Sequence, residues 1–413
     1  MRILKVCVGD PRSGIKGDAK LVVERTKRLE RRGYVVDILY IVDNPWSLSS
    51  RLVVTHERDR VGLDIECRIG LLSIVRGLAR LKEFSMNPIQ TWFSYIARFG
   101  YSERIEVIYS AYSLIHFYHI RSCGLIHEDL KSTPGVLDLI DSYTLNISNK
   151  IGVTRSWWLR LALREELRRI RRVERDIDVV TEGLAKCSVL TVTDKDAAYI
   201  GGRLSKRVVI PVGVELSVNE EQRDLSLGRD GFSMIFFGNL NYEPNKNASR
   251  IIIAASRRIR EKWGGLVRIV IAGRFISSNL RREALREGIE VYSPVSDMKA
   301  LVESCEVAVL PMISGSGMQS KVLESIAWGC LLITTRRAAE PVGLVEGEEY
   351  LRAETANEIV ETVEQLMKGD KKTDTIRRKA LSRIKRLDWE MTVAQLCEVY
   401  EELLSRDAES HGC

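Results

Sequence analysis

Residues 3–42 read ILKVCVGDPRSGIKGDAKLVVERTKRLERRGYVVDILYIV, and this stretch indicates the fold class. The apolar run at 3–8 predicts a buried strand, and a loop with several glycines follows it. The apolar spacing after that loop predicts a helix from 19 to 32, which Gly33 ends. A second apolar run at 34–42 predicts the next strand. A strand, a loop, a helix and a strand in this order open a parallel, doubly wound α/β sheet.

The same alternation continues along the rest of the chain, with a break in the polar stretch 219–230. In the first half, further strands are predicted at 105–109, 135–140, 188–192 and 208–211. One long helix is predicted at 156–185. After the break, strands are predicted at 233–237, 267–272, 290–292, 307–311 and 331–335. We therefore expect an α/β protein whose domains span 1–212 and 213–387, followed by a C-terminal segment, 388–413.

The C-terminal segment contains an amphipathic helix at about 391–404. Its apolar side chains, together with the tryptophan that precedes it, form a single stripe: Trp389, Val393, Leu396, Val399, Tyr400 and Leu403. The simplest interpretation is a helix that packs on the domain before it.

The overall composition is that of an ordinary globular protein. Of the 413 residues, 45% are hydrophobic and 29% are charged, and the net charge is +7. A mildly basic chain fits an anionic ligand or an anionic membrane surface better than an acidic partner. No apolar segment is long enough to cross a membrane and no secretory signal is recognised, so a cytoplasmic protein is expected. The cysteines show no C-x-x-C or metal-ligand spacing, and no metal site is predicted.

The stretch 311–330, PMISGSGMQSKVLESIAWGC, carries the most chemical information. Gly315, Ser316 and Gly317 form a small-residue loop at the start of a helix, where free N–H groups and the helix dipole favour a diphosphate. Lys321 would add a positive charge, and Glu324 could accept hydrogen bonds from ribose hydroxyls. The alternative is an ordinary loop followed by a surface Lys–Glu pair.

This stretch resembles the donor-binding signature of family 4 glycosyltransferases. Residues 323–329, LESIAWG, match its second half, whereas Ser316 stands where the family has a first glutamate. One branch, typified by bacterial exopolysaccharide sugar transferases, has Arg-x-Lys-x-Leu-Glu instead. Residues 319–324, QSKVLE, are similar to that version, with Gln319 in place of the arginine.

Other stretches resemble the same branch in the same order along the chain. Residues 236–248, FFGNLNYEPNKNA, are similar to its first donor-domain element and place Gly238 and Asn239 at a strand end. A structural turn is the alternative at this point. Further donor-binding candidates are Arg274 in 271–274, IAGR, and Ser296 in 294–298, PVSDM. Residues 211–215, PVGVE, resemble the linker between the two domains.

In the first domain, residues 16–18, KGD, resemble a loop of this branch. Gly14 and Gly17 would let the backbone approach the donor phosphates. Asp18 is the first candidate catalytic carboxylate, with a helix cap as the alternative. Asp141, at the end of a strand that also resembles the branch, is the second candidate. The three histidines His116, His119 and His127 lie near the place where many relatives carry a catalytic histidine, but a structural role is expected for them.

The resemblance implies the GT-B architecture: two Rossmann-like domains that face each other across a cleft, with the C-terminal helix crossing back to the first domain. It implies transfer of a hexosyl group from a UDP- or GDP-linked sugar to an acceptor hydroxyl of a glycan, polysaccharide or glycolipid. Retention of configuration and independence of a metal ion or other cofactor are expected. The alternatives are a non-catalytic nucleotide-sugar-binding scaffold and another GT-B enzyme, such as a nucleotide-sugar epimerase.

Residues 155–175, RSWWLRLALREELRRIRRVER, form a basic segment within the predicted long helix. The Trp157–Trp158 pair and the arginines suggest peripheral contact with the anionic inner face of a membrane. The alternative is a helix that packs on the first domain and exposes a solvated basic face. Nucleic acid is not an expected partner, because no known reader motif occurs and glutamates locally balance the charge.

Overall fold

A computed structural model describes most of the chain in two compact units. Unit 1 comprises Met1–Gly213 and Trp389–Cys413, and unit 2 comprises Val214–Asp388. The two units are described separately. The described residues are 1–11, 17–44, 49–56, 60–68, 108–126, 130, 133–154, 156–216, 227, 231–314, 317–369 and 372–405.

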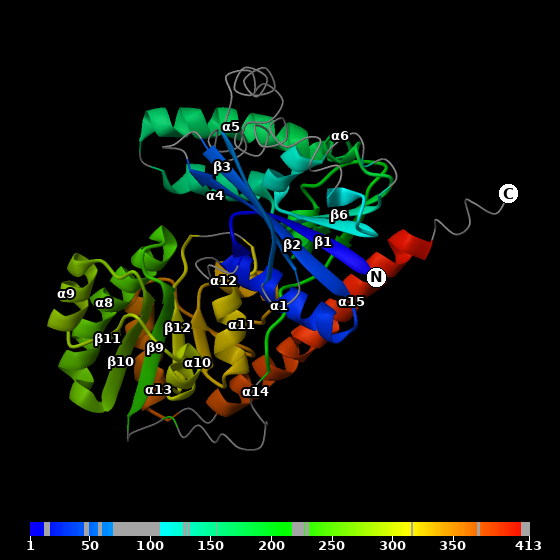
Figure 1. The fold of residues 1–413 in the computed structure, drawn as a ribbon. Coiled ribbons are helices and arrows are strands. Elements are labelled where there is room, and N and C mark those ends of the chain that lie inside the picture. The colour runs from blue at the N-terminus through cyan, green and yellow to red at the C-terminus, as the bar shows by residue number, and fades with distance from the viewer. Residues whose placement is uncertain are drawn as a thin grey trace. The chain divides into compact units, whose positions relative to one another are not determined.

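Unit 1 is built on a sheet with the strand order β4-β3-β2-β1-β5-β6-β7-β8 (Figure 1). Within the described ranges its strands are β1 (Arg2–Val8), β2 (Val35–Asn44), β3 (Ser49–His56), β4 (Arg60–Arg68), β5 (Leu114–Tyr118), β6 (Gly135–Ile140), β7 (Cys187–Thr191) and β8 (Lys206–Val209). All neighbouring pairs from β2 to β8 are parallel, whereas β3 and β4 add an antiparallel edge. The antiparallel pair was not predicted from the sequence.

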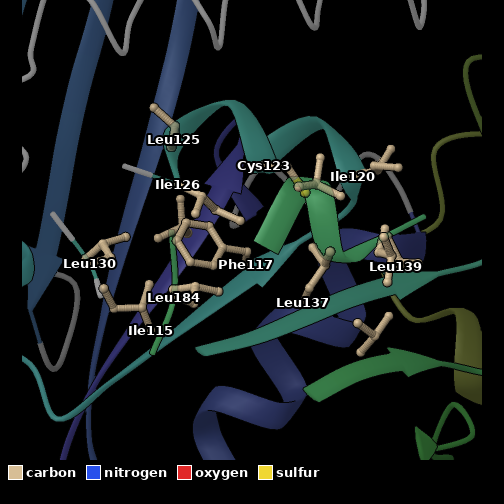
Figure 2. Packing of buried hydrophobic residues seen from close by; sticks show 14 of the residues in the cluster. Ile115, Phe117, Ile120, Cys123, Leu125, Ile126, Leu130, Leu137, Leu139 and Leu184 are labelled. Atoms are coloured by element: carbon tan, nitrogen blue, oxygen red, sulfur yellow. The ribbon is translucent and has the colours of Figure 1, made fainter. Parts of the chain in front are cut away.

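Helices cover both faces of this sheet. They are α1 (Gly17–Arg31), η3 (Ile120–Leu125), α4 (Tyr143–Val153), α5 (Trp157–Arg175), α6 (Asp178–Thr181), α7 (Asp194–Ala197) and α15 (Trp389–Ser405). Because side chains alternate along a strand, Leu4 and Ile115 pack toward α5, whereas Ile3 and Leu114 pack toward α15. Figure 2 shows the first of these clusters, in which η3 contributes Ile120, Cys123 and Leu125.

The strand predicted at 105–109 is wrong where the structure describes it. Residues 108 and 109 are helical, and the strand that belongs to the sheet lies further on, at β5. All five residues of β5, LIHFY, are buried. The sequence did not predict this strand because a histidine at its centre interrupts the apolar run. A polar residue in such a run argues against a fully buried strand unless its partners are known.

The long helix predicted at 156–185 is two helices. Asp176 leaves the helical conformation with φ −131° and ψ 64°, so α5 ends at Arg175 and α6 begins at Asp178. The side chain of Asp178 then accepts hydrogen bonds from the backbone N–H groups of Leu204 and Ser205. Within the described part of the chain, no helix is both long and apolar enough to span a bilayer.

The C-terminal helix α15 is part of the core of unit 1. All six residues of the predicted stripe are buried, and Val393, Leu396 and Tyr400 pack with Ile3 and Leu114. Gly213 lies against the ring of Trp389, where a Cβ atom would come within 2.3 Å of it.

Unit 2 contains a second parallel sheet, with the order β11-β10-β9-β12-β13-β14. Its strands, among the residues described, are β9 (Phe232–Asn239), β10 (Val267–Arg274), β11 (Glu290–Tyr292), β12 (Val307–Leu310), β13 (Leu331–Thr334) and β14 (Leu351–Arg352). The first five match the strands predicted from the sequence to within two residues at each end. The two-residue strand β14 was not predicted.

Several helices of unit 2 begin at residues that favour a helix start. They are α8 (Glu243–Trp263), η5 (Gly264–Leu266), α9 (Ser278–Arg286), α10 (Met298–Glu303), α11 (Ser320–Ala327), α12 (Arg336–Ala339), η6 (Glu340–Val342), α13 (Ala356–Met367), α14 (Thr373–Ile384) and η7 (Lys385–Leu387). Pro244 lies in the first turn of α8, and Ser277 caps α9 by accepting from Leu280 N–H. Thr355 and Glu358 form a capping box at α13.

Candidate functional site

The order of the strands in unit 2 puts a topological switch point between β9 and β12. The chain runs from β9 outward to β10 and β11, then returns to the other side of β9 with β12. Ligands of open α/β sheets bind at the carboxyl ends of the strands at such a point. Gly238, near the end of β9, and the segment from β12 to α11 meet there.

Two glycines bring the ends of β9 and β10 close together. Gly238 has φ 148° and Gly273 has φ 154°, and the two residues are register partners. A Cβ atom on Gly273 would lie 1.8 Å from the carbonyl oxygen of Gly238. A Cβ atom on Gly238 would lie 3.2 Å from Nζ of Lys321. Glycine at 238 therefore avoids a steric contact and lets the Lys321 ammonium group come close to the end of β9.

Lys321 projects from the first turn of α11 toward the end of β9. Its Nζ donates a hydrogen bond to Oδ1 of Asn245 at 2.5 Å and lies 4.9 Å from the ring centroid of Phe236. Nδ2 of Asn245 in turn donates to the carbonyl oxygen of Asn239 at 2.8 Å. Asn245 therefore connects the strand end to the lysine. Its oxygen is neutral, so this hydrogen bond adds no counter-charge to the ammonium group.

The surroundings of Lys321 lower the pKa of its ammonium group to about 7. Burial is the cause, since it penalises the charged form, and the Glu324 carboxylate opposes it only in part. Lys321 as a residue is nevertheless half-buried and not fully enclosed. An anionic ligand at this point would restore the positive charge.

The start of α11 offers further polar groups. Gly317 has φ 68°, a left-handed conformation that suits glycine, and Gln319 is the N-cap residue. Oε1 of Gln319 is buried and has no hydrogen-bond partner in the described structure. Glu324 lies one turn beyond Gln319 and is half-buried. The helix end therefore combines free backbone N–H groups, an unfilled acceptor and a carboxylate.

Two more predicted donor-binding residues lie at the same edge of the sheet, on neighbouring strands. Arg274 is exposed at the end of β10. Ser296 is exposed in the loop between β11 and α10. Gly14, Gly315 and Ser316 lie outside the described residues, as does His127.

In unit 1, the candidate catalytic residues also follow the carboxyl ends of parallel strands. Gly17 and Asp18 lie in the first turn of α1, which follows β1. Asp141 follows β6 and is half-buried. The residue before it, Ile140, has φ 65°, which is unfavourable for a β-branched side chain and points to a tightly constrained turn.

His119 also has an unusual backbone conformation. It follows β5, and its φ of 62° with ψ of 151° falls in a region that is almost confined to glycine. Its N–H donates to the carbonyl oxygen of Asp138 at 2.7 Å, which ties the ends of β5 and β6 together. The sequence did not distinguish His119 from the other histidines, because a residue's identity does not reveal that its backbone is strained.

His116, by contrast, belongs to a buried polar cluster with Arg25, Asp138 and Tyr400. Its Nδ1 lies 2.6 Å from the Tyr400 hydroxyl, and Arg25 forms an ion pair with Asp138. Burial lowers the pKa of His116 to about 4, against the opposing effect of Asp138. Its role is therefore structural, as expected from the sequence.

The comparisons with known proteins concern the family and the fold. Residues 231–369, which lie in unit 2, match the family model described as "Glycosyl transferases group 1". A search of the curated proteins finds no match. Sugar transfer is the general activity that this match supports.

Several solved structures share the fold over nearly the whole chain. Sucrose-phosphate synthase from Thermosynechococcus elongatus is 14% identical with a TM-score of 0.66, covering 98% of this chain and 100% of its own. The α,α-trehalose 6-phosphate synthase from Burkholderia multivorans is 13% identical with a TM-score of 0.61, covering 100% and 98%. Anabaena HepE, solved with UDP and glucose, is 13% identical with a TM-score of 0.60, covering 97% and 100%. The chain thus has the GT-B fold of two Rossmann-like domains.

Proposed function

We propose, from the group 1 glycosyltransferase match over residues 231–369, that this chain transfers a hexosyl group from a nucleoside-diphosphate sugar to an acceptor hydroxyl. The observation that carries the proposal is the position of Lys321, a half-buried residue whose ammonium group lies beside Gly238 at the switch point of the unit 2 sheet. This is where an open α/β sheet binds a phosphorylated ligand.

Each candidate donor-binding group has a distinct role. The diphosphate would contact the N–H groups at the start of α11 and the ammonium group of Lys321. Glu324, one turn further along α11, would accept hydrogen bonds from the ribose. Arg274 would supply a second cation from the end of β10. UDP and GDP are the proposed nucleotides, and the presence of UDP in the HepE structure supports the first.

We also propose that the anomeric configuration is retained and that no metal ion is required. A departing nucleoside diphosphate carries negative charge that fixed cations and helix dipoles can stabilise without reorganising. Lys321 and the start of α11 provide both in unit 2. Full activity in EDTA would support this proposal, whereas loss of activity that Mg²⁺ restores would refute it.

For unit 1 we propose Asp18 and Asp141 as the carboxylates that orient or deprotonate the acceptor. Both follow strands β1 and β6 at their carboxyl ends, and the constrained backbone at Ile140 fixes the start of the turn that holds Asp141. His119 joins them as a third candidate, because its strained conformation is tied to the same strand by the hydrogen bond to Asp138.

We further propose that α5 makes peripheral contact with an anionic membrane, which would suit a lipid-linked glycan acceptor. Trp157, Trp158 and Leu161 are 77%, 61% and 61% exposed on its first turns. Exposed arginines continue along the same outer face: Arg164, Arg168, Arg171, Arg172 and Arg175. Tryptophan beside arginine matches the interfacial region of a bilayer.

The first experiment is a thermal-shift and calorimetric panel of UDP, GDP, ADP, CMP and dTDP on the wild type and on Glu324→Ala. Ligand at 100 times its Kd should stabilise the protein by about 2.7 kcal/mol. We expect one nucleotide to bind the wild type and to bind Glu324→Ala much more weakly. Failure of every nucleotide to bind the wild type would refute the proposal.

The second experiment separates the rival activities. The donor identified above is incubated with and without lipid and glycan acceptors, and the products are resolved by mass spectrometry. A glycosyltransferase yields a sugar-bearing acceptor and nucleoside diphosphate. An epimerase alters the donor without any acceptor, and a binding scaffold leaves it intact in every mixture.

Membrane contact is tested by flotation with vesicles that contain anionic lipid. The wild type should float, whereas Trp157→Ala/Trp158→Ala should not. Leu204→Ala is the matched control, because Leu204 is an 88% exposed apolar residue of unit 1 outside α5. A wild type that stays at the bottom of the gradient would refute the contact.

A further inference from the structure

Phe275 has a backbone conformation that its side chain does not favour. It directly follows β10 with φ 60°, and its ring is 55% exposed. A positive φ is costly for a bulky residue, and glycine would adopt it without strain. An aromatic ring that remains more than half exposed regains little of that cost by packing. Strain of this kind at the edge of a site suggests that the ring serves a ligand.

The backbone around Phe275 is fixed by the two glycines at the ends of β9 and β10. Gly273 packs against the carbonyl group of Gly238, and the backbone N–H of Leu240 donates to the carbonyl oxygen of Arg274 at 2.8 Å. These contacts determine where β10 ends and how the chain leaves it. The ring is therefore held one strand away from the point where Lys321 meets β9.

The two sides of the switch point differ in what they present. On the β13 side, Thr335 and Met312 are buried, and the Thr335 hydroxyl donates to the Met312 carbonyl oxygen at 2.9 Å, while the neighbouring Ile313 and Arg336 are exposed. On the β10 side, Arg274, Phe275 and Ser296 are all exposed. Of these exposed groups, the aromatic ring lies on the side of β10, and this is the side on which the nucleoside of a nucleotide bound at Lys321 would stack.

We infer that the ring of Phe275 is the surface on which the nucleobase of the donor stacks. The inference rests on the proposed function and adds the residue that holds the base. Stacking on an aromatic ring accepts any base, because every base has a π face. Phe275 thus supplies affinity for the nucleoside, and the polar groups around it are left to distinguish one base from another.

The test is calorimetry with UDP, GDP and inorganic pyrophosphate on four proteins. These are the wild type, Phe275→Gly, Phe275→Trp and Leu285→Ala. Loss of one base–aromatic stack weakens binding by about 5- to 150-fold. We expect that loss for the nucleotide in Phe275→Gly, with pyrophosphate affinity unchanged. Phe275→Trp should bind the nucleotide as the wild type does.

The other two measurements separate stacking from folding. Phe275→Gly relieves the positive φ, so its melting temperature should equal or exceed that of the wild type. Leu285→Ala changes a 53% exposed apolar residue of α9 and should leave nucleotide affinity unchanged.

The outcomes are distinct. A wild type that binds pyrophosphate but no nucleotide overturns both this inference and the proposed function. Nucleotide binding that Phe275→Gly does not weaken overturns the inference alone. Equal weakening of nucleotide and pyrophosphate also overturns it, because Phe275 would then act by positioning the phosphate-binding loop.

Discussion

Lys5 in unit 1 and Lys321 in unit 2 are both lysines whose pKa is lowered to about 7 by burial. Lys5 lies on β1 beneath α1, and none of its surface is exposed. Its Nζ donates to Oγ1 of Thr26 at 2.8 Å and lies 3.4 Å from the carbonyl oxygen of Val22. Lys321 is half-buried at the carboxyl edge of its sheet, where glycine at 238 lets the ammonium group come close to the end of β9.

The two charge environments differ as well. Lys5 belongs to a closed cluster that contains the Arg25–Asp138 ion pair, His116 and Tyr400. In the structure described, Lys321 has a neutral amide oxygen as its nearest polar partner. A lowered pKa therefore reports burial in both cases. Position at a strand's carboxyl edge, together with incomplete burial of the residue, is what separates a candidate binding group from a structural one.

The largest effect is expected when the closed cluster loses its carboxylate. Asp138→Ala leaves the guanidinium group of Arg25 buried without its counter-charge, and arginine cannot discharge by losing a proton. We expect the free energy of unfolding to fall by about 3–5 kcal/mol, measured by urea denaturation.

The double variant Arg25→Met/Asp138→Leu is the control for this prediction. Replacing a buried ion pair by apolar residues of similar size is often close to neutral, so most of the stability should return. An Asp138→Ala protein as stable as the wild type would contradict the structural role of the cluster.

The next effect separates the two lysines directly. Lys321→Met removes a charged hydrogen-bond donor from the proposed phosphate site, and nucleotide affinity should fall by about 10- to 150-fold. Lys5→Met removes the other lysine at similar volume and should leave nucleotide affinity unchanged. Calorimetry measures the nucleotide affinity of both variants. Equal affinities would contradict the assignment of Lys321 as a binding residue and Lys5 as a structural one.

The pH dependence of donor binding sharpens the same comparison. The Lys321 ammonium group loses its proton as the pH rises through about 7, and a diphosphate favours the protonated form. Affinity should therefore be highest below pH 7 and fall by up to about 20-fold between pH 6.5 and 8.5.

The ligand for this measurement is a nucleoside-diphosphate sugar, because its two phosphodiester groups keep their charge across this range. Lys321→Arg is the control, since arginine remains charged throughout and should give a flat profile. A wild-type profile as flat as that of the arginine variant would show that the lysine charge does not govern binding.

The smallest effect concerns the link between the closed cluster and α15. Tyr400→Phe removes the hydroxyl group that lies 2.6 Å from Nδ1 of His116. We expect a loss of about 1 kcal/mol in the free energy of unfolding, with nucleotide affinity unchanged. Loss of nucleotide affinity in this variant would mean that the cluster influences the donor site.

The sequence predicted the parallel α/β pattern well where local signals were strong. Buried apolar runs located β9, β10 and β12, since both faces of a parallel sheet are covered and the run is continuous. The same rule failed at β5, where His116 interrupts the apolar run and is accommodated by partners that include Asp138 of β6 and Tyr400 of α15.

The sequence also identified the residue types of the candidate donor site, because a glycine loop, a lysine and a glutamate lie within ten positions of one helix start. It did not identify Asn245 or Phe275 as members of the site. Asn245 reaches Lys321 across 76 positions of the chain, and Phe275 is marked by a backbone angle that its identity does not predict. Periodicity and spacing report contacts within one element, whereas contacts between elements depend on how the strands are ordered in the sheet. The residue types of the candidate site could therefore be predicted from the sequence. The tertiary structure decided which of them lie together at one edge of the unit 2 sheet.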